Sequence, residues 1–259
     1  MTSLPAEVVA AFGATGEPRL LEGGKGGTWR VGDVILKPAE GDAETRWRAA
    51  VLTDLPESPH LRVARPLRAA DGDWIAHGWE AQRAVAGQPD QRRVGEVLGA
   101  GIAFHRSVAA LPRPSFLDVR DGPWAYGDRL AWGSEPMRRE SGPVRRLLAA
   151  RRPVHAESQV VHGDLLGNVL FADGLPPAII DWPAYWRPPA WAYAVAVVDA
   201  VTWHGADPAV VARWAHLPDW DQMLVRASIY RIATWDAAGW AAEPEEAYAP
   251  VVDALLARV

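Results

Sequence analysis

Short apolar runs separated by turn-forming residues dominate the first third of the chain. A short helix is predicted for residues 5–12, where Pro5 suits the first helical turn. Apolar runs follow at residues 20–21, 28–31 and 34–37. A glycine-rich segment separates the first two runs, and a Gly-Asp pair separates the last two. Because Gly and Asp between such runs are typical of tight turns, we expect three short strands in meander order.

A helix and two further strands complete the predicted N-terminal lobe. Residues 42–52 place apolar side chains at helical spacing, with Asp42 as the expected N-cap. Residues 61–68 and 74–85 have the composition of two strands around a turn. The segment 87–90, Gly-Gln-Pro-Asp, interrupts this pattern. We therefore expect a linker between two lobes at this point.

The rest of the chain is mostly helical in its pattern. Two strand-like runs, 161–171 and 179–182, stand among segments that we expect to be helical, of which 94–111 places its apolar residues close to helical spacing. These helical segments are 94–111, 145–151, 190–203, 208–215, 221–238 and 244–258. A β-rich beginning and an α-rich remainder predict an α+β fold. We expect a small lobe built on an antiparallel sheet over residues 1–86 and a mostly helical lobe over residues 87–259.

Composition and charge narrow the functional classes. Of the 259 residues, 49% are hydrophobic and 23% are charged, and the formal net charge of −5 disfavours binding to nucleic acid. The absence of Cys excludes disulfides and thiolate chemistry. The longest apolar run, 190–198, is far shorter than the ~20 residues of a membrane helix, and the N-terminus has no signal-peptide pattern. We expect a cytoplasmic monomer or weak homodimer without nucleic-acid or membrane partners.

The glycine-rich segment is the first candidate for ligand binding. Glycines let backbone N–H groups approach a phosphate because no Cβ stands in the way. The candidate residues are Gly24, Gly26, Gly27 and Thr28. A flexible hairpin without a ligand is the alternative.

Lys37 is the second candidate, because it ends the apolar run that follows the glycine-rich hairpin. A buried ammonium group is costly unless it is paired. Lys37 therefore either lies at the exposed end of its strand or binds an anion. Glu44 on the next predicted helix is the expected partner, and Glu40 is the second choice.

Three polar residues lie in or beside the two strand-like runs in the second half of the chain. Asp164 and Asn168 lie within the first run, and Asp181 lies in the second. Phosphoryl transfer needs a carboxylate that orients the acceptor hydroxyl and oxygen ligands for Mg²⁺. Asp164 suits the first task, and Asn168 and Asp181 suit the second. A hairpin between the runs would bring the three residues to one end.

These motifs resemble those of the aminoglycoside phosphotransferase and choline kinase family. The resemblance rests on segment 162–170, with sequence HGDLLGNVL, and on segment 179–182, with sequence IIDW. It extends to Lys37 and to the Ala-Phe-His of residues 103–105. It implies the two-lobed protein-kinase-like fold, with ATP and Mg²⁺ as cofactors.

The resemblance also implies a role for each candidate residue. Asp164 is implied as the catalytic base, Asn168 and Asp181 as Mg²⁺ ligands, and Lys37 as a contact to the ATP phosphates. It further implies an adenine-binding hinge around residues 83–85, with Arg83 and Val85 contacting the base through backbone atoms. His162 is implied as a structural residue under the catalytic loop.

Two departures place the chain in a divergent branch. Asn168 follows Asp164 by four residues, whereas the family usually has five. The Gly-Asp-Pro and the helix-opening Asp that follow the second metal ligand in the family are replaced by segment 185–191, with sequence YWRPPAW.

We expect a kinase that phosphorylates a hydroxyl of a small molecule such as an amino sugar, an aminoglycoside or an amino alcohol. A degenerate nucleotide-binding protein with a regulatory role and a nucleotidyltransferase are the alternatives. The C-terminal helices offer candidates for the acceptor site through stacking or cation–π contacts, with ordinary helix packing as the competing interpretation. These candidates are Asp199, Trp203, His204, Trp235 and Asp236.

Overall fold

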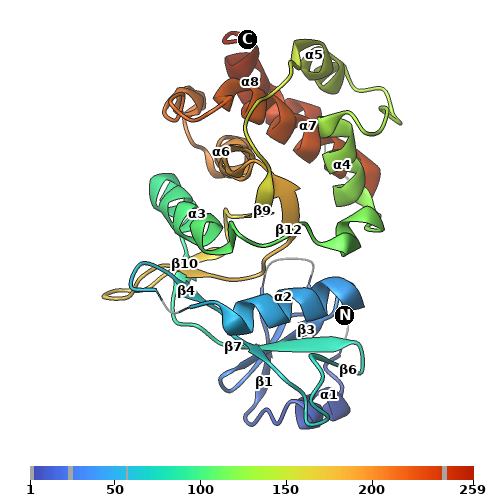
Figure 1. The fold of residues 1–259 in the computed structure, drawn as a ribbon, viewed down its shortest axis with the longest axis vertical. Coiled ribbons are helices and arrows are strands. Elements are labelled where there is room, and N and C mark those ends of the chain that lie inside the picture. The colour runs from blue at the N-terminus through green and yellow to red at the C-terminus, as the bar shows by residue number, and fades with distance from the viewer. Residues whose placement is uncertain (1–2, 23–25, 57, 241–243) are drawn as a thin grey trace. The chain divides into compact units, whose positions relative to one another are not determined.

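The structure, a computed structural model, describes residues 3–22, 26–56, 58–240 and 244–259 (Figure 1). The chain forms two units. The first comprises Met1–Gln88 and Leu170–Ile180, and the second comprises Pro89–Val169 and Asp181–Val259. The first division thus falls after Gln88, and the segment between the two strand-like runs belongs to the first unit.

An antiparallel sheet forms the main part of the first unit. Its strands follow the order β1-β2-β3-β7-β5, and β6 pairs with β7. Their bounds are β1 (Pro18–Leu20), β2 (Trp29–Val31), β3 (Val34–Pro38), β5 (Pro66–Leu67), β6 (Ile75–Ala76) and β7 (Trp79–Arg83). The predicted meander of the first three strands is confirmed by the antiparallel pairing of β1 with β2 and of β2 with β3. Leu36 and Val31 face a core that α1 (Ala6–Ala11) covers with Val8.

The two longer predicted strands are each divided in the structure. Residues 74–85 form β6 and β7 around a tight turn, in which His77 and Gly78 have φ angles of 51° and 77°. Positive φ at both turn residues matches the right-handed twist of the paired strands. Residues 61–68 form β4 (Arg62–Val63) and β5, and β5 begins at Pro66, which has no N–H to donate.

The helix predicted for residues 42–52 is confirmed as α2 (Asp42–Asp54). Its N-cap is Gly41 rather than the expected Asp42, and Asp42 is the first helical residue. An acidic side chain in the first turn still stabilises the positive end of the helix dipole.

The predicted hairpin between the two strand-like runs is also confirmed. β10 (Val169–Phe171) and β11 (Ala178–Ile179) are neighbours in a second sheet, and β11 pairs in parallel with β4. The short strand β8 (Gln88–Pro89) lies where the linker was expected.

Helices make up most of the second unit (Figure 1). They are α3 (Val94–Val108), α4 (Pro123–Trp132), α5 (Gly142–Ala150), α6 (Pro189–His204), α7 (Trp220–Ala238) and α8 (Pro244–Leu256). Two short 3-10 helices span Ser115–Asp118 and Pro208–Ala212. The α-helix expected over residues 208–215 is therefore wrong. Helix α4, which begins at Pro123 after Gly122, was not predicted.

Helix α6 forms the centre of the second unit. All its residues from Ala190 to Val201 are buried, and it contacts α3, α7 and α8. A helix that is apolar on every side must be enclosed by other elements. Beside it, β9 (Gln159–His162) and β12 (Ala184–Arg187) form an antiparallel pair.

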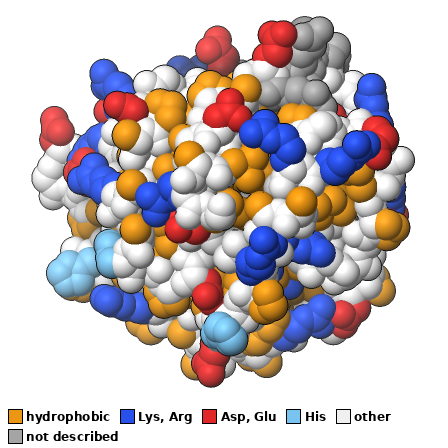
Figure 2. All heavy atoms as spheres, turned by 90° about the horizontal axis from the view of Figure 1, so that it is seen from above, with side chains coloured by type: hydrophobic (Ala, Val, Ile, Leu, Met, Phe, Trp, Pro, Cys, Tyr) orange, Lys and Arg blue, Asp and Glu red, His pale blue; other side chains and the backbone are white. Residues whose placement is uncertain are grey.

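The sheet-rich first unit and the helical second unit confirm the α+β class. Among the described residues, none of the helices combines the length and the apolar composition that a membrane span requires. Figure 2 shows basic and acidic side chains interspersed with apolar ones on one face of the molecule.

Candidate functional site

The pairing of β9 with β12 brings together the segment that carries Asp164 and the segment that carries Asp181. His162 lies opposite Ala184 in the antiparallel register, and the N–H of Gly163 donates to the carbonyl of Pro183 at 3.1 Å. The chain leaving β9 and the chain entering β12 therefore run side by side. Because Asp164 and Asp181 lie on these two segments, both acids occur at the same end of the strand pair.

Gly163 allows this close approach. A Cβ atom added at this position would overlap the ring of Tyr185 on β12. Tyr185 cannot easily withdraw, because it is buried and its hydroxyl lies 2.9 Å from that of Tyr230 on α7. Any side chain at residue 163 would push the two segments apart.

The four-residue step from Asp164 to Asn168 closes as a tight turn. The Asn168 N–H donates to the carbonyl of Leu165 at 3.0 Å. Asn168 Nδ2 donates to the Asp164 carbonyl at 2.7 Å and lies 3.2 Å from Asp164 Oδ2. Gly167 supplies a φ of 89°, which few other residues adopt. The turn thus fixes Asn168 to Asp164 at both backbone and side chain.

Two buried histidines, His162 and His105, form a chain of hydrogen bonds that ends at the backbone of this turn. His162 Nδ1 accepts the N–H of Asp164 at 3.1 Å. His105 Nε2 in turn accepts the N–H of His162 at 2.9 Å, and His105 Nδ1 lies 3.0 Å from the Tyr193 hydroxyl. The His162 contact fits the structural role that the resemblance implies for it. Sequence reasoning identified His105 only as a helix-face residue and as part of the resemblance.

Asp181 lies directly before an anchored residue. The Trp182 ring is buried, its Nε1 donates to the carbonyl of Val161 at 3.1 Å, and it packs edge-on against Phe104 at 4.8 Å between centroids. Asp181 itself is exposed and has a φ of 47°. Positive φ outside Gly is uncommon and concentrates at functional positions.

Arg231 on α7 contacts Asp164 directly and was not predicted from the sequence. Arg231 Nη2 lies 2.5 Å from Asp164 Oδ1 and 2.5 Å from Asp199 Oδ2. Arg231 Nε also donates to Asp199 Oδ1 at 2.9 Å. In the sequence, the available signal was an Arg within an apolar stretch, residues 229–233 with sequence IYRIA.

The charges of this group determine its pKa values. Burial alone would lower the pKa of the Arg231 guanidinium, but the carboxylates of Asp199 and Asp164 outweigh it and hold that pKa well above its ordinary value. Burial raises the pKa of Asp199, and Arg231 partly counters this effect. The guanidinium is therefore charged at any working pH.

In the first unit, Lys37 belongs to a network of charged side chains. Its Nζ lies 3.6 Å from Oε1 of Glu80, which is its cross-strand partner between β3 and β7. Glu80 also accepts two hydrogen bonds from Arg48 Nη2, at 2.6 and 2.7 Å. Arg48 Nη1 lies 4.0 Å from Glu44 Oε1 on the first turn of α2.

Glu80 and Arg48 were not predicted from the sequence as members of this network. Glu80 was one acid in a strand-like run and Arg48 one base on a helix face, so neither stood out. Only the register of the sheet places Glu80 opposite Lys37.

The glycine-rich segment is described from Gly26 onward, and Gly24 lies outside the described residues. Gly26 and Gly27 have φ angles of 76° and 86°. The Thr28 carbonyl accepts the N–H of Leu21 at 2.8 Å. This segment therefore closes a hairpin between β1 and β2.

Part of the backbone in the predicted hinge is used within the first unit. The Arg83 N–H donates to the Arg65 carbonyl, and the Ala84 N–H donates to the Asp33 carbonyl, each at 2.7 Å. The Arg83 side chain forms an exposed ion pair with Asp33. Val85 follows as a half-buried residue.

Two candidate acceptor residues stack beside the Arg231 group. Trp203 and Trp235 lie one helical turn beyond Asp199 and Arg231, on α6 and α7. Their ring centroids are 5.0 Å apart with an interplanar angle of 21°, and Trp203 is 41% exposed. His204 ends α6 and is exposed.

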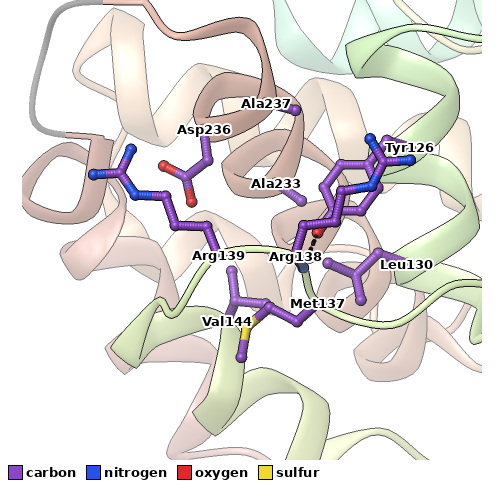
Figure 3. Close-up of a pocket in the computed structure, with 9 residues that line it drawn as sticks. All are labelled: Tyr126, Leu130, Met137, Arg138, Arg139, Val144, Ala233, Asp236 and Ala237. Atoms are coloured by element: carbon purple, nitrogen blue, oxygen red, sulfur yellow. Dashed lines mark hydrogen bonds between the residues drawn. The ribbon is translucent and has the colours of Figure 1, made fainter.

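Asp236 lies elsewhere in the second unit, in a cavity of about 190 Å³. Figure 3 shows Asp236 and Arg139 on one side of this cavity and Arg138 over Tyr126 on the other. The Arg138 N–H donates to the Tyr126 hydroxyl at 2.7 Å. The cavity lies between α4, α5 and α7 and does not include Asp164.

The whole chain is similar to solved small-molecule kinases. A thermostable mutant of aminoglycoside phosphotransferase APH(4)-Ia, in complex with ADP and hygromycin B, has a TM-score of 0.61 at 15% identity, covering 98% of this chain and 99% of that one. Choline kinase LicA from Streptococcus pneumoniae has a TM-score of 0.58 at 10% identity, covering 97% of each chain. The GDP complex of wild-type aminoglycoside 2'-phosphotransferase-IIIa has a TM-score of 0.56 at 15% identity, covering 93% of this chain and 92% of that one.

These likenesses define the fold as the two-lobed protein-kinase-like fold of small-molecule kinases. Specifically, aminoglycoside phosphotransferases and choline kinases share it with this chain, as the motif resemblance implied. No protein-family model and no curated protein sequence matches the chain.

Proposed function

We propose that the protein is an ATP- and Mg²⁺-dependent kinase that transfers the γ-phosphoryl group to a hydroxyl of a small molecule. The observation that carries this proposal is the strand pairing that holds Asp164, Asn168 and Asp181 at one end of β9 and β12. We further propose a cytoplasmic monomer or weak homodimer whose acceptor is an amino sugar, an aminoglycoside or an amino alcohol.

Asp164 is proposed as the catalytic base. Its side chain is 41% exposed, and Oδ1 is held by Arg231. Oδ2 lies 3.2 Å from Asn168 Nδ2 and keeps acceptor capacity, since a carboxylate oxygen accepts more than one hydrogen bond. The acceptor hydroxyl would pass its proton to this carboxylate as its oxygen bonds to the γ-phosphorus, and ADP would leave with the electrons of the broken P–O bond.

Asn168 and Asp181 are proposed to hold Mg²⁺. Because Asn168 Nδ2 is turned toward Asp164, its amide oxygen is presented on the other side. Among the described residues, no cluster of three or more acidic or His side chains forms a metal site. Mg²⁺ prefers one or two protein oxygens completed by phosphate and water oxygens, so the present donor set fits. The ion would neutralise charge on the phosphates.

The nucleotide-binding residues are proposed on the first unit. Lys37, oriented by Glu80, would pair with ATP phosphates, and Glu44 would stabilise the network through Arg48. Because the N–H groups of Arg83 and Ala84 are already used, adenine would be contacted through the Val85 backbone and the Arg83 carbonyl. These roles rest on the local contacts of each residue.

The phosphate cradle is proposed at the glycine-rich hairpin. Gly26, Gly27 and Thr28 line the described part of that hairpin, and Gly24 completes the proposed set from the sequence alone. Positive φ at Gly26 and Gly27 allows backbone N–H groups to turn toward an anion.

The test is acceptor-dependent ADP formation. The protein is incubated with Mg·ATP and a panel of aminoglycosides, amino sugars and amino alcohols, while ADP and AMP are quantified. Asp164→Asn should lower kcat by about 10²-fold or more, as expected for loss of a general base, and should leave ATP binding unchanged. Asp173→Asn, in the exposed turn between β10 and β11, is the control and should retain activity.

The alternatives predict different products. AMP release would indicate nucleotidyl transfer. Binding of ATP without any turnover would indicate a degenerate nucleotide-binding protein. Failure to bind ATP in the presence of Mg²⁺ would rule out the kinase and the nucleotidyltransferase together.

A further inference from the structure

Arg231 is placed between two carboxylates of different exposure. The Asp199 side chain is 11% exposed and the Arg231 side chain is 13% exposed, whereas the Asp164 side chain is 41% exposed. Arg231 binds Asp199 through Nε and Nη2, with distances of 2.9 and 2.5 Å. Such a two-nitrogen contact fixes the plane of the guanidinium. The single contact to Asp164 Oδ1 therefore comes from a rigid donor.

A second buried Arg on the same helix, Arg226, has no carboxylate among the described residues in hydrogen-bond contact. Burial of a guanidinium on α7 therefore does not by itself require two acidic partners. Arg226 is 6% exposed. Its guanidinium donates to neutral oxygens, namely the carbonyls of Gln222 and Arg152 at 3.2 and 2.7 Å and the Gln222 side chain at 3.0 Å. Helix α7 thus buries one guanidinium on neutral oxygens and another on two acids.

The electrostatics of the two residues differ accordingly. Burial lowers the pKa of Arg226 to about 10. The two carboxylates instead raise the pKa of Arg231 well above its ordinary value against the effect of burial. Arg231 is therefore a permanent charge at Asp164.

We propose that Arg231 is a positioning residue for phosphoryl transfer, anchored by Asp199 and holding Asp164 Oδ1 so that Oδ2 is presented to the acceptor hydroxyl. The role rests on the proposed kinase function. It also assigns Asp199 to the support of Arg231 rather than to acceptor binding, because both of its oxygens contact this guanidinium.

The physical basis is orientation of the base. A carboxylate on an exposed loop rotates freely, and a misplacement of about 1 Å in a reacting group costs on the order of 10²-fold in rate. Asn168 holds Oδ2 only at 3.2 Å, whereas Arg231 holds Oδ1 at 2.5 Å. Arg231 is thus the stronger restraint on the carboxylate.

The experiment compares variants of the full-length protein with ATP and an acceptor identified by the panel. Arg231→Met removes the guanidinium, and Arg231→Met/Asp199→Asn removes it without leaving a buried unpaired carboxylate. We expect kcat to fall about 10²-fold in both, with the Kd for ATP within about twofold of wild type. Added methylguanidinium should restore part of the kcat of Arg231→Met, which keeps the anchoring carboxylate of Asp199, and Arg231→Lys should retain more kcat than Arg231→Met.

Arg226→Met is the matched control for a structural effect, because it removes a buried guanidinium from the same helix without touching Asp164. We expect a comparable fall in Tm and a loss of kcat below about threefold. If the double variant keeps wild-type kcat, or if kcat follows Tm equally in the Arg226 and Arg231 variants, the positioning role is overturned.

A measurement without turnover separates this inference from the proposed function. In a double-mutant cycle of Asp164→Asn and Arg231→Met, the two Tm shifts should be non-additive because the residues are in contact. Additive shifts in an active enzyme overturn the positioning role alone. A wild-type protein that forms no ADP with any acceptor, but shows the non-additive shifts, overturns the kinase function and leaves the contact established as structural.

Discussion

His105 Nε2 accepts the backbone N–H of His162 at 2.9 Å, so the proton of the neutral His105 ring must be on Nδ1, which lies 3.0 Å from the Tyr193 hydroxyl. Full burial, with a smaller effect of His162, lowers the pKa of His105 to about 3. The ring is therefore neutral in the folded protein across the physiological range. It links α3 to the segment that carries Asp164.

This relationship predicts a pH dependence of stability. An unfolded chain protonates His105 near its ordinary pKa of about 6.5, whereas the folded chain does so only near 3. The unfolded state thus binds one more proton between these values, and stability falls as the pH drops from about 6.5 to 3, by up to about 1.4 kcal/mol per pH unit. Denaturant unfolding at a series of pH values measures this slope.

His105→Gln should reduce that slope by up to about 1.4 kcal/mol per pH unit, the contribution of one proton, because Gln does not titrate. The comparison with wild type cancels the contributions of acidic groups, which act in the same direction at low pH. Equal slopes for the two proteins would mean that His105 is not held neutral by burial.

Gly163→Ala should separate the two segments that carry Asp164 and Asp181. The added Cβ overlaps the Tyr185 ring, and overpacking of this kind costs about 1–3 kcal/mol. We expect a lower free energy of unfolding together with a large loss of kcat. Gly142→Ala is the control, since a Cβ there meets nothing within 4 Å; a similar loss in both variants would argue against a special constraint at Gly163.

Glu80→Gln should destabilise the first unit. Lys37 and Arg48 would lose the carboxylate that lies between them in a site only 11–16% exposed, at a cost of about 3–5 kcal/mol. The Kd for ATP should rise as Lys37 loses its orientation. Asp33→Asn breaks an ion pair whose side chains are 57% and 69% exposed and should change stability little. Chemical denaturation and ATP titration of both variants provide the comparison.

Trp203→Ala tests the acceptor side. Trp203 stacks on Trp235 at 5.0 Å one helical turn from the Arg231 group, and its exposed face can stack on a sugar or an organic cation. We expect the acceptor KM to rise about tenfold, in keeping with a loss of 1–2 kcal/mol of stacking, with the ATP KM unchanged. Trp214→Ala, in the separate pair with Trp220, is the control, and equal effects on the acceptor KM would reject the assignment.

Much of the architecture follows from local pattern. The meander of β1, β2 and β3 follows from apolar runs broken by Gly and Asp, because such turns are local. Helix α3 follows from apolar residues at helical spacing, and α6 follows from an apolar run that is too long for a typical strand. By contrast, α4 contains mixed polar and apolar residues, and it is stabilised mainly by its packing against α7.

The candidate site likewise contains residues that the sequence predicts and residues that only the structure identifies. Asp164, Asn168 and Asp181 stand out in the sequence because polar residues that can bind a metal or a proton interrupt apolar runs. Arg231 and Glu80 do not stand out, because each is one charge in an ordinary helix or strand. Arg231 is 67 residues from its partner Asp164 along the chain, and Glu80 is 43 residues from its partner Lys37.

By itself, the sequence determined the α+β class, the order of most elements and the acids on which a kinase function rests, since these depend on residue type and short-range spacing. Only the tertiary structure decided which charges meet. The register of β3 with β7 placed Glu80 opposite Lys37, and the packing of α6 on α7 enabled Asp199 to hold Arg231 against Asp164. Contacts between distant residues depend on packing and strand register, which no local pattern encodes.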